Sequence, residues 1–198
     1  QGSNSIEGYN ATLSEAVDIV DEERPETLLE ETARALRGYR TAMTYILRIH
    51  NDPYTRIDTG FIRSLHYMML SYDLSKKPGQ WRPGFVYVVH EPTGDTVYEG
   101  PDAELVPALM EELVAQINEG STLSPLIRGA MAHLNLTMIH PFGDGNGRMA
   151  RALQTLVLAK DGVISPVFCS IEEWLGRNTD AYYKILEETG AGKWNPGR

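Results

Sequence analysis

Residues 137–153 read TMIHPFGDGNGRMARAL, and this stretch decides how the rest of the chain is interpreted. His140 and Pro141 lead into three glycines at alternate positions, with two arginines close behind. A loop that only reverses the chain needs one glycine and no paired arginines. Apolar residues at helical spacing flank the stretch on both sides, over residues 124–139 and 147–160. We therefore predict a ligand-binding loop between two buried helices.

The segment before the loop has two interpretations. Ser124 followed by Pro125 is a favourable helix start. The apolar face expected for this helix consists of Leu126, Ile127, Ala130, Met131, Leu134 and Met138. Alternating apolar side chains over residues 134–138 also fit a strand. Pro141 ends either element, because the residue before a proline is disfavoured in helical geometry, so His140 is expected at the mouth of the loop.

The loop composition favours an anionic ligand. Gly143, Gly145 and Gly147 allow successive backbone N–H groups to point inward, and the start of the next helix adds further N–H groups and a positive dipole end. Arg148 and Arg151 are three residues apart on one face of the first helical turn, where they could hold a chain of phosphates.

Two further side chains complete a candidate reaction site. Asp144 could hold Mg²⁺ between two phosphates, because Mg²⁺ prefers one or two carboxylates together with phosphate oxygens. His140 is a candidate base beside the anion. The set predicts chemistry on a nucleotide.

Other phosphate-binding loops have different spacings. A P-loop requires Lys followed by Ser or Thr after the last glycine, and the dinucleotide fingerprint is GxGxxG, whereas this chain has GxGxG. On spacing alone, a solvated turn with two surface arginines is the alternative.

Residues 140–151, HPFGDGNGRMAR, match the motif HPFx(D/E)GNGRxxR throughout, so the chain resembles the Fic domain family. GQWRPGFVYVV is similar to that family's PGxxR segment and flap hairpin, and LIRGAMAHLNLTMIHPF is similar to the helix that leads into its active site. The resemblance covers roughly residues 1–190. It implies a mainly α fold, a Fic-type helical bundle with a β-hairpin flap beside the active-site loop.

The resemblance implies a protein adenylyltransferase, which transfers AMP from ATP to a Ser, Thr or Tyr hydroxyl of a target protein. The catalytic residues would be His140 as base, Asn146 and Arg148, and Asp144 would ligate Mg²⁺. The nucleotide-binding residues would be Gly143, Gly145, Asn146, Gly147, Arg148, Arg151, Tyr182 and Tyr183. The two tyrosines border the adenine pocket in this interpretation, and both could equally be core residues. Phe142 is expected to anchor the loop in the core.

The N-terminal segment resembles an inhibitory motif of the same family, (S/T)xxxE(G/N). Ser3, Glu7 and Gly8 match it, and the resemblance implies that Glu7 pairs with Arg151 and misaligns ATP. Ser3 also fits a remnant of a cleaved tag, which leaves Glu7 and Gly8 as the firmer half of the match. A short N-terminal helix with a solvated Glu7 is the alternative.

A β-hairpin is predicted over residues 85–98, where β-branched and aromatic residues flank the turn tetrad PTGD. The resemblance implies that a target segment docks along this hairpin by strand addition, and a plain edge ribbon is the alternative. Further helices are predicted over residues 27–47, 59–71, 102–118 and 171–188. The expected core-facing stripe of the 27–47 helix is Leu29, Ala33, Leu36, Tyr39, Met43 and Leu47.

Three parts are expected: residues 1–24 as an N-terminal segment with the inhibitory helix, 25–190 as the Fic domain, and 191–198 as a tail. The formal net charge of -9 opposes binding to nucleic acid, which usually needs a basic face. No apolar run reaches the ~18 residues of a membrane span, so we expect no membrane contact and a cytosolic location.

The remaining reactive side chains have simpler interpretations. Cys169 is the only cysteine, which excludes an internal disulfide, and a packing role is favoured over a nucleophile. His133, His66 and His90 are expected to be packed histidines rather than catalysts.

Related activities are also considered. Death-on-curing kinases carry lysine where this chain has Gly147, whereas phosphocholine transferases share most of the loop. The alternative from another functional class is a binding or regulatory module without catalytic activity. The target, the modified side chain, AMP removal and the oligomeric state, including a homo-oligomer, stay open.

Overall fold

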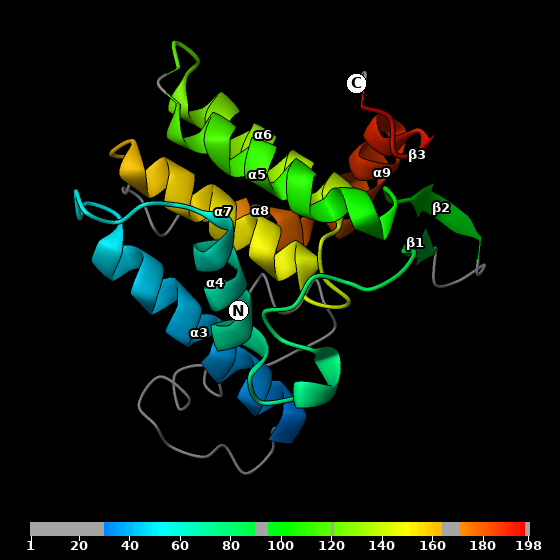
Figure 1. The fold of residues 1–198 in the computed structure, drawn as a ribbon, viewed down its shortest axis with the longest axis horizontal. Helices are drawn as coiled ribbons and strands as arrows, with labels where there is room; N and C mark the ends of the chain where they lie inside the picture. The colour runs from blue at the N-terminus through cyan, green and yellow to red at the C-terminus, as the bar shows by residue number, and fades with distance from the viewer. Residues whose placement is uncertain (1–29, 90–94, 120, 164–170, 197–198) are drawn as a thin grey trace.

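The computed structural model describes residues 30–89, 95–119, 121–163 and 171–196, and helices make up most of them (Figure 1). The helices are α3 (Glu30–Ile49), α4 (Thr59–Leu70), α5 (Val106–Asn118), α6 (Pro125–Ile139), α7 (Asn146–Lys160), α8 (Ile171–Arg177) and α9 (Thr179–Gly190), with the short turns η1 (Leu74–Lys76) and η2 (Ala103–Leu105). The strands are β1 (Tyr87–Val89), β2 (Thr96–Glu99) and β3 (Gly192–Lys193). The mainly α prediction is confirmed.

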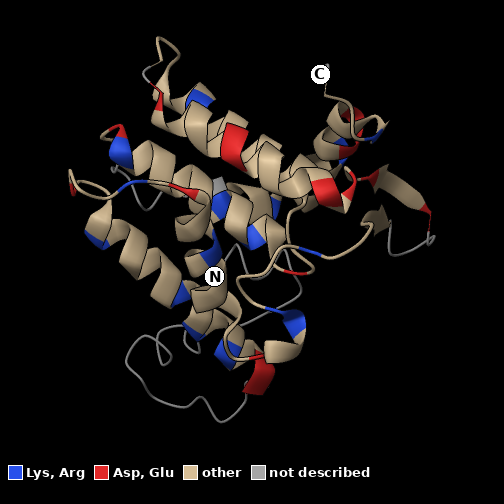
Figure 2. Cartoon of the chain, in the orientation of Figure 1, with Lys and Arg blue, Asp and Glu red and all other residues tan. Residues whose placement is uncertain are grey.

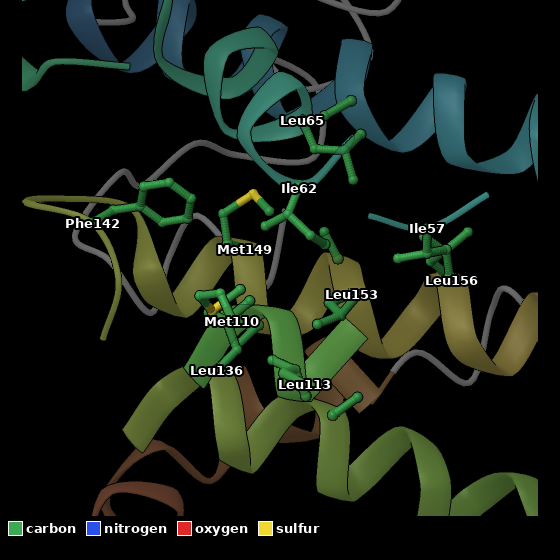
Figure 3. Close-up of a cluster of buried hydrophobic side chains, with 14 of the residues drawn as sticks. Ile57, Ile62, Leu65, Met110, Leu113, Leu136, Phe142, Met149, Leu153 and Leu156 are labelled. Carbon is green, nitrogen blue, oxygen red and sulfur yellow. The ribbon is translucent and has the colours of Figure 1, made fainter. Parts of the chain in front are cut away.

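Helix α7 runs through the middle of the molecule, between α3 and α4 on one side and α5 and α6 on the other (Figure 1). Almost every residue of α7 is buried, including polar residues of its first turns. Figure 3 shows Met149, Leu153 and Leu156 of this helix among apolar side chains of α4, α5 and α6. The loop that precedes α7 is therefore attached directly to the centre of the core.

Helix α6 begins as predicted, because Ser124 caps it by accepting a hydrogen bond from the backbone N–H of Ile127, and Pro125 occupies its first turn. The strand alternative is excluded. The predicted apolar face was wrong: Leu126, Ile127 and Met131 are exposed.

The buried face of α6 instead begins with two small residues. The buried residues of α6 are Gly129, Ala132, His133, Leu136 and Ile139. A Cβ atom on Gly129 would lie 3.1 Å from Cδ2 of Leu158, so the glycine leaves room for this side chain of α7. A partner on the next helix thus helps to select the buried face.

The other predicted helices need smaller corrections. The stripe of α3 is confirmed at Ala33, Leu36 and Tyr39, but further along Ala42 and Ile46 are fully buried in place of Met43 and Leu47. Leu29 lies outside the described residues. The helix predicted from residue 102 begins as η2, and α5 follows it.

The single helix predicted over residues 171–188 is two helices. Asn178 leaves helical geometry with φ −126° and ψ 39°, and its side-chain amide donates to the carbonyl of Trp174 at 2.8 Å. Asparagine often competes with helix propagation through such a local bond, which explains the break between α8 and α9.

The predicted hairpin is confirmed as β1 and β2, which pair antiparallel with Tyr87 opposite Glu99 and a register shift between Val88 and Val89. Residues 90–94 at its tip lie outside the described residues. Strand β3 was not predicted, and it pairs parallel to β2 inside the segment expected to be a tail. Among the described residues, no helix combines the length and apolar character that crossing a bilayer requires.

Candidate active site

His140 is the residue that ends α6, and it adopts a left-handed conformation with φ 51° and ψ 57°. Its backbone N–H donates to Leu136 at 2.9 Å, and its Nδ1 lies 3.3 Å from the carbonyl oxygen of Thr137. A carbonyl can only accept, so this contact places the ring proton on Nδ1. Nε2 is then the basic nitrogen of His140.

Phe142 anchors the loop that follows. Its side chain is fully buried and stacks on the His66 ring, with 3.7 Å between centroids and 3° between planes, while Trp81 lies 5.1 Å away on a tilted approach. The predicted core role of Phe142 is confirmed.

His66, on α4, is a packed histidine as predicted, and it also holds the loop backbone. The N–H of Gly79 donates to its Nδ1 at 2.8 Å, so Nε2 carries the ring proton and donates to the Asp144 carbonyl at 2.9 Å. Burial lowers the pKa of His66 to about 4. The neutral ring therefore bridges two segments of the site.

Asn146 closes the loop on itself. Its Oδ1 accepts from the backbone N–H of Phe142 and its Nδ2 donates to the Phe142 carbonyl, both at 2.9 Å. The side chain expected to contact phosphate is thus used to shape the loop, and one hydrogen of Nδ2 is left over from the bond to Phe142.

The three glycines are not equivalent. Gly145 has φ 76°, and a Cβ atom there would lie 2.6 Å from Cδ1 of Leu70, so both backbone geometry and space require glycine. A Cβ atom on Gly143 would meet nothing within 4 Å. Gly147 lies in the first turn of α7, whose hydrogen bonding starts with the Met149 N–H donating to the Gly145 carbonyl at 2.9 Å.

Asp144 is surrounded by positive groups. Its Oδ2 lies 3.1 Å from Nζ of Lys76, its Oδ1 lies 3.6 Å from a guanidinium nitrogen of Arg148, and Oδ1 also accepts from the N–H of Gly145 at 2.6 Å. Burial raises the pKa of this carboxyl, but the hydrogen bond from Lys76, the charges of Arg148 and Lys76 and the Gly145 N–H outweigh it and lower the pKa overall. Asp144 is ionised at neutral pH.

Arg148 and Arg151 both point into the protein, with exposed fractions of 0% and 1%. They are one turn apart at the N-terminal end of α7, where Figure 2 shows basic positions on the central helix. Burying two guanidinium groups is costly unless anionic groups compensate their charge. A chain of phosphates at this helix end would supply such compensation.

Arg82 joins the loop to the base of the hairpin, although no individual role was predicted for it. Its Nε donates to the His140 carbonyl at 2.8 Å, its other nitrogens donate to the carbonyls of Gly84 and Pro101, and its backbone N–H donates to Pro141 at 2.9 Å. The side chain is 5% exposed. The sequence signal for this residue is an arginine inside the glycine- and proline-rich run GQWRPG, which resembles the PGxxR segment.

His133 is also a packed histidine as predicted. Its Nδ1 contacts Oε1 of Gln154 at 2.8 Å and its Nε2 contacts the hydroxyl of Tyr182 at 3.0 Å. Tyr182 is buried, and its ring meets His133 edge-on, whereas Tyr183 is 46% exposed. Of the two tyrosines, Tyr183 is the one with a solvent-accessible ring.

Several predicted residues cannot be placed relative to this site. Ser3, Glu7, Gly8, His90 and Cys169 lie outside the described residues. Two contacts were missed for a different reason: Lys76 and His66 reach Asp144 across 68 and 78 positions of the chain, and no local pattern reports such a distance.

The residues around Asp144 fit a magnesium ion that is shared with phosphate. The described residues contain no group of three or more His, Cys, Asp or Glu side chains able to hold a metal by themselves. One ionised carboxylate next to a helix N-terminus is instead an arrangement in which Mg²⁺ would take its other ligands from phosphate and water.

Comparisons with known proteins agree with this geometry. Residues 56–158 match the model of the Fic/DOC family. The chain is 27% identical over 98% of its length to protein adenylyltransferase Fic of Nematostella vectensis, covering 43% of it, and 30% identical over 98% of its length to protein adenylyltransferase Fic of Drosophila yakuba, covering 37% of it.

A crystal structure of a Fic domain containing signaling protein from Bacteroides thetaiotaomicron superposes with a TM-score of 0.79 at 26% identity, over 93% of this chain and 67% of that one. The chain spans less than half the length of the curated relatives it matches. The matched residues 56–158 are more than half of its 198 residues and include the whole loop. This chain belongs to the Fic/DOC family.

Proposed function

We propose that this chain is the catalytic module of a protein adenylyltransferase, which transfers AMP from ATP to a Ser, Thr or Tyr hydroxyl of a target protein. The main observation in support is that one short loop connects two groups. The first is His140, whose Nε2 is the basic ring nitrogen, and the second is the N-terminus of α7 with its two buried arginines. The names of the full-length relatives support the same activity.

The proposed reaction is a single displacement at the α-phosphorus. The target hydroxyl oxygen forms a bond to this phosphorus, the bond to the oxygen bridging the α- and β-phosphates breaks, and pyrophosphate leaves. The hydroxyl proton moves to Nε2 of His140. Arg148 and Arg151 hold the distal phosphates so that the leaving group lies opposite the hydroxyl.

The loop backbone stabilises the charge that grows on the α-phosphate. The first N–H groups of α7 point toward the helix end, and the remaining hydrogen of Asn146 Nδ2 adds a donor there. Mg²⁺ bound through Asp144 would neutralise part of the charge on the phosphate oxygens. Tyr183 is the candidate to stack on the adenine, because its ring is accessible and that of Tyr182 is not.

The target is proposed to dock along the hairpin of residues 85–98. Among the described residues, β1 has β2 on one side only and is the outer strand of the sheet, so its other edge can pair with an extended segment. The base of the hairpin is fixed to the site, because Tyr98 donates from its hydroxyl to the Met138 carbonyl at 2.8 Å. A docked segment would therefore lie next to His140.

Inhibition by Glu7 is a separate part of the proposal. The sequence motif supports it, together with the burial of Arg151, since a glutamate that pairs with this guanidinium would displace a distal phosphate from it. A charge-assisted bond is worth roughly 1.5–3 kcal/mol, so Glu7→Gly should raise AMP transfer by about 10- to 100-fold. An equally slow Glu7→Gly variant would exclude this restraint.

The test of the activity uses ATP labelled at the α- or the γ-phosphate, with intact-mass analysis of candidate targets. Label should enter from the α-position only, and His140→Ala should reduce transfer by about a hundredfold or more while ATP binding persists. His50→Ala, at the end of α3, is the matched control and should transfer normally.

Other outcomes identify the competing activities. Incorporation from the γ-label would indicate a kinase, and incorporation only from a phosphocholine donor would indicate the related transferase. A quiet binding module would show no stabilisation by ATP and Mg²⁺ in a thermal shift. Incubation of AMP-modified target with the same protein tests whether the loop also removes AMP.

A further inference from the structure

Lys76 lies on the turn η1 and reaches into the candidate site from outside the Fic loop. Its Nζ is 3.1 Å from Oδ2 of Asp144 and 3.5 Å from Oε1 of Glu31, which belongs to the first turn of α3. The lysine side chain is 20% exposed and that of Asp144 is 36% exposed. This is a partly buried ion pair, so solvent screens it less than an exposed one.

The position of the Lys76 ammonium is defined by the turn that carries it. Asp73 caps η1 by accepting from the backbone N–H of Ser75 at 3.0 Å and from its hydroxyl at 2.6 Å. Lys77 ends the turn in a left-handed conformation, and the Lys76 ammonium also lies 5.6 Å from the centroid of the Tyr72 ring. The ammonium is therefore presented to Asp144 by an ordered turn.

Both oxygens of Asp144 are engaged by this arrangement. Oδ1 accepts from the Gly145 N–H and faces Arg148, and Oδ2 faces Lys76. A divalent cation bound to Oδ2 would lie within a few ångströms of the ammonium, where two like charges repel strongly. The metal and Lys76 cannot both keep close contact with the same oxygen.

We infer that Lys76 competes with Mg²⁺ for Asp144, so that metal entry into the nucleotide site requires this lysine to release the carboxylate. The inference rests on the proposed function, because it assumes that Asp144 ligates the metal of bound ATP. Lys76 then sets how strongly Mg²⁺ and the nucleotide promote each other's binding.

Glu31 provides the second half of the exchange. When Lys76 leaves Asp144, the carboxylate of Glu31 is already 3.5 Å from the ammonium and can retain it. This lowers the cost of displacing the lysine, so loss of the Glu31 charge should weaken metal entry. The effect of Glu31 should disappear when Lys76 is absent, because it acts through that lysine.

The test measures binding of α,β-methylene ATP, which cannot be cleaved between its α- and β-phosphates. The metal-coupling ratio is the Kd in EDTA divided by the Kd in saturating Mg²⁺. Lys76→Met should raise this ratio by about tenfold, because the metal no longer displaces a charge-assisted contact. Lys77→Met removes the same charge from the exposed neighbouring position and should change the ratio by less than about twofold.

Two comparisons decide the outcome. If Lys76→Met leaves the ratio unchanged or lowers it while Asp144→Asn reduces it, the competition is refuted and the metal site stands. If Asp144→Asn itself leaves the ratio unchanged, Asp144 does not bind the metal, and the proposed mechanism fails together with the inference.

The double-mutant cycle gives an independent check. Glu31→Gln should lower the ratio by about two- to threefold in the otherwise unchanged protein and have no effect in Lys76→Met. An equal effect of Glu31→Gln in both backgrounds would show that Glu31 acts through the general field of the site, and would refute its part in the exchange.

Discussion

The loop of residues 140–151 and the hairpin of β1 and β2 meet at Arg82 but are built in opposite ways. In the loop, Phe142, Asn146 and Arg148 are buried, and backbone carbonyls bond to side chains from distant elements. In the hairpin, Tyr87 and Val89 are about half exposed, and within the described part of the chain β1 pairs on one edge only. The loop is suited to holding reacting atoms at fixed positions, whereas the hairpin can accept different partner segments.

The largest expected effect comes from breaking the junction between the two regions. Arg82→Ala removes the donor shared by the carbonyls of His140, Gly84 and Pro101, so one buried and two partly buried acceptors lose a charged partner. We expect a loss of roughly 4 kcal/mol in the free energy of unfolding, measured by urea denaturation. Arg63→Ala is the control: it removes an exposed arginine bonded to Gly79 and should cost less than about 1 kcal/mol. Similar losses for both would mean that Arg82 is not a special junction.

Within the loop, substitutions at two glycines test how strictly the backbone conformation and the available space limit the residue type. Gly145→Ala forces a side chain into a left-handed backbone and against Leu70, and should destabilise the protein by about 2–3 kcal/mol. Gly143→Ala introduces the same methyl group into open space and should cost less than about 1 kcal/mol. Thermal unfolding of the two variants side by side measures the difference. Equal destabilisation would contradict the view that Gly145 alone is conformationally required.

The buried histidine His133 on α6 should make the free energy of unfolding depend on pH. Burial lowers the pKa of His133 to about 4, and the nearby Arg151 charge acts in the same direction. The unfolded chain, with an ordinary pKa near 6.5, binds the proton first as pH falls, so the contribution is complete above about pH 6.5 and is lost on the way down to about pH 4. We expect a decrease of about 2 kcal/mol between about pH 7 and about pH 5 from this residue.

Urea denaturation at several pH values checks this dependence. His133→Asn should remove about half of the slope, because burial also lowers the pKa of His66 to about 4 and this second histidine contributes a similar share. A His133→Asn protein with the slope unchanged would mean that another group titrates.

The hairpin should show the smallest effect on stability. Tyr87→Ser replaces a half-exposed ring on the outer strand and should change the free energy of unfolding by less than about 0.5 kcal/mol. Transfer to a target that docks along β1 should nevertheless decrease, seen as a higher KM with a nearly unchanged kcat. A stability loss comparable to that of Gly145→Ala would erase the contrast between the two regions.

The sequence predicted the helical class, the loop and the hairpin because these depend on local signals. Ser124 with Pro125 marks a helix start, and the glycine spacing marks a turn that must approach other atoms closely. Prediction from the sequence failed where a residue distant in the chain determines the local structure. The buried face of α6 depends on Leu158 of α7 next to Gly129, and β3 forms because Tyr98 and Glu99 offer a free edge at the right place.

The candidate site divides in the same way. The motif residues His140 to Arg151 could be named because their spacing is continuous in the sequence. The groups that hold them, among them His66 and Arg82, come from other elements, and only folding brings them to the loop. Asn146 shows the limit of assigning roles by residue type, since much of its amide is engaged with Phe142.

The left-handed conformation of His140 has a consequence for how this protein can evolve. Glycine is the residue that ends a helix in this geometry at the lowest cost in stability. A histidine in the same conformation destabilises the fold by roughly 1 kcal/mol relative to glycine. A population of variants selected only for thermal stability should therefore replace His140 and lose the reaction. Selection for thermal stability and selection for the proposed reaction would therefore act on this position in opposite directions.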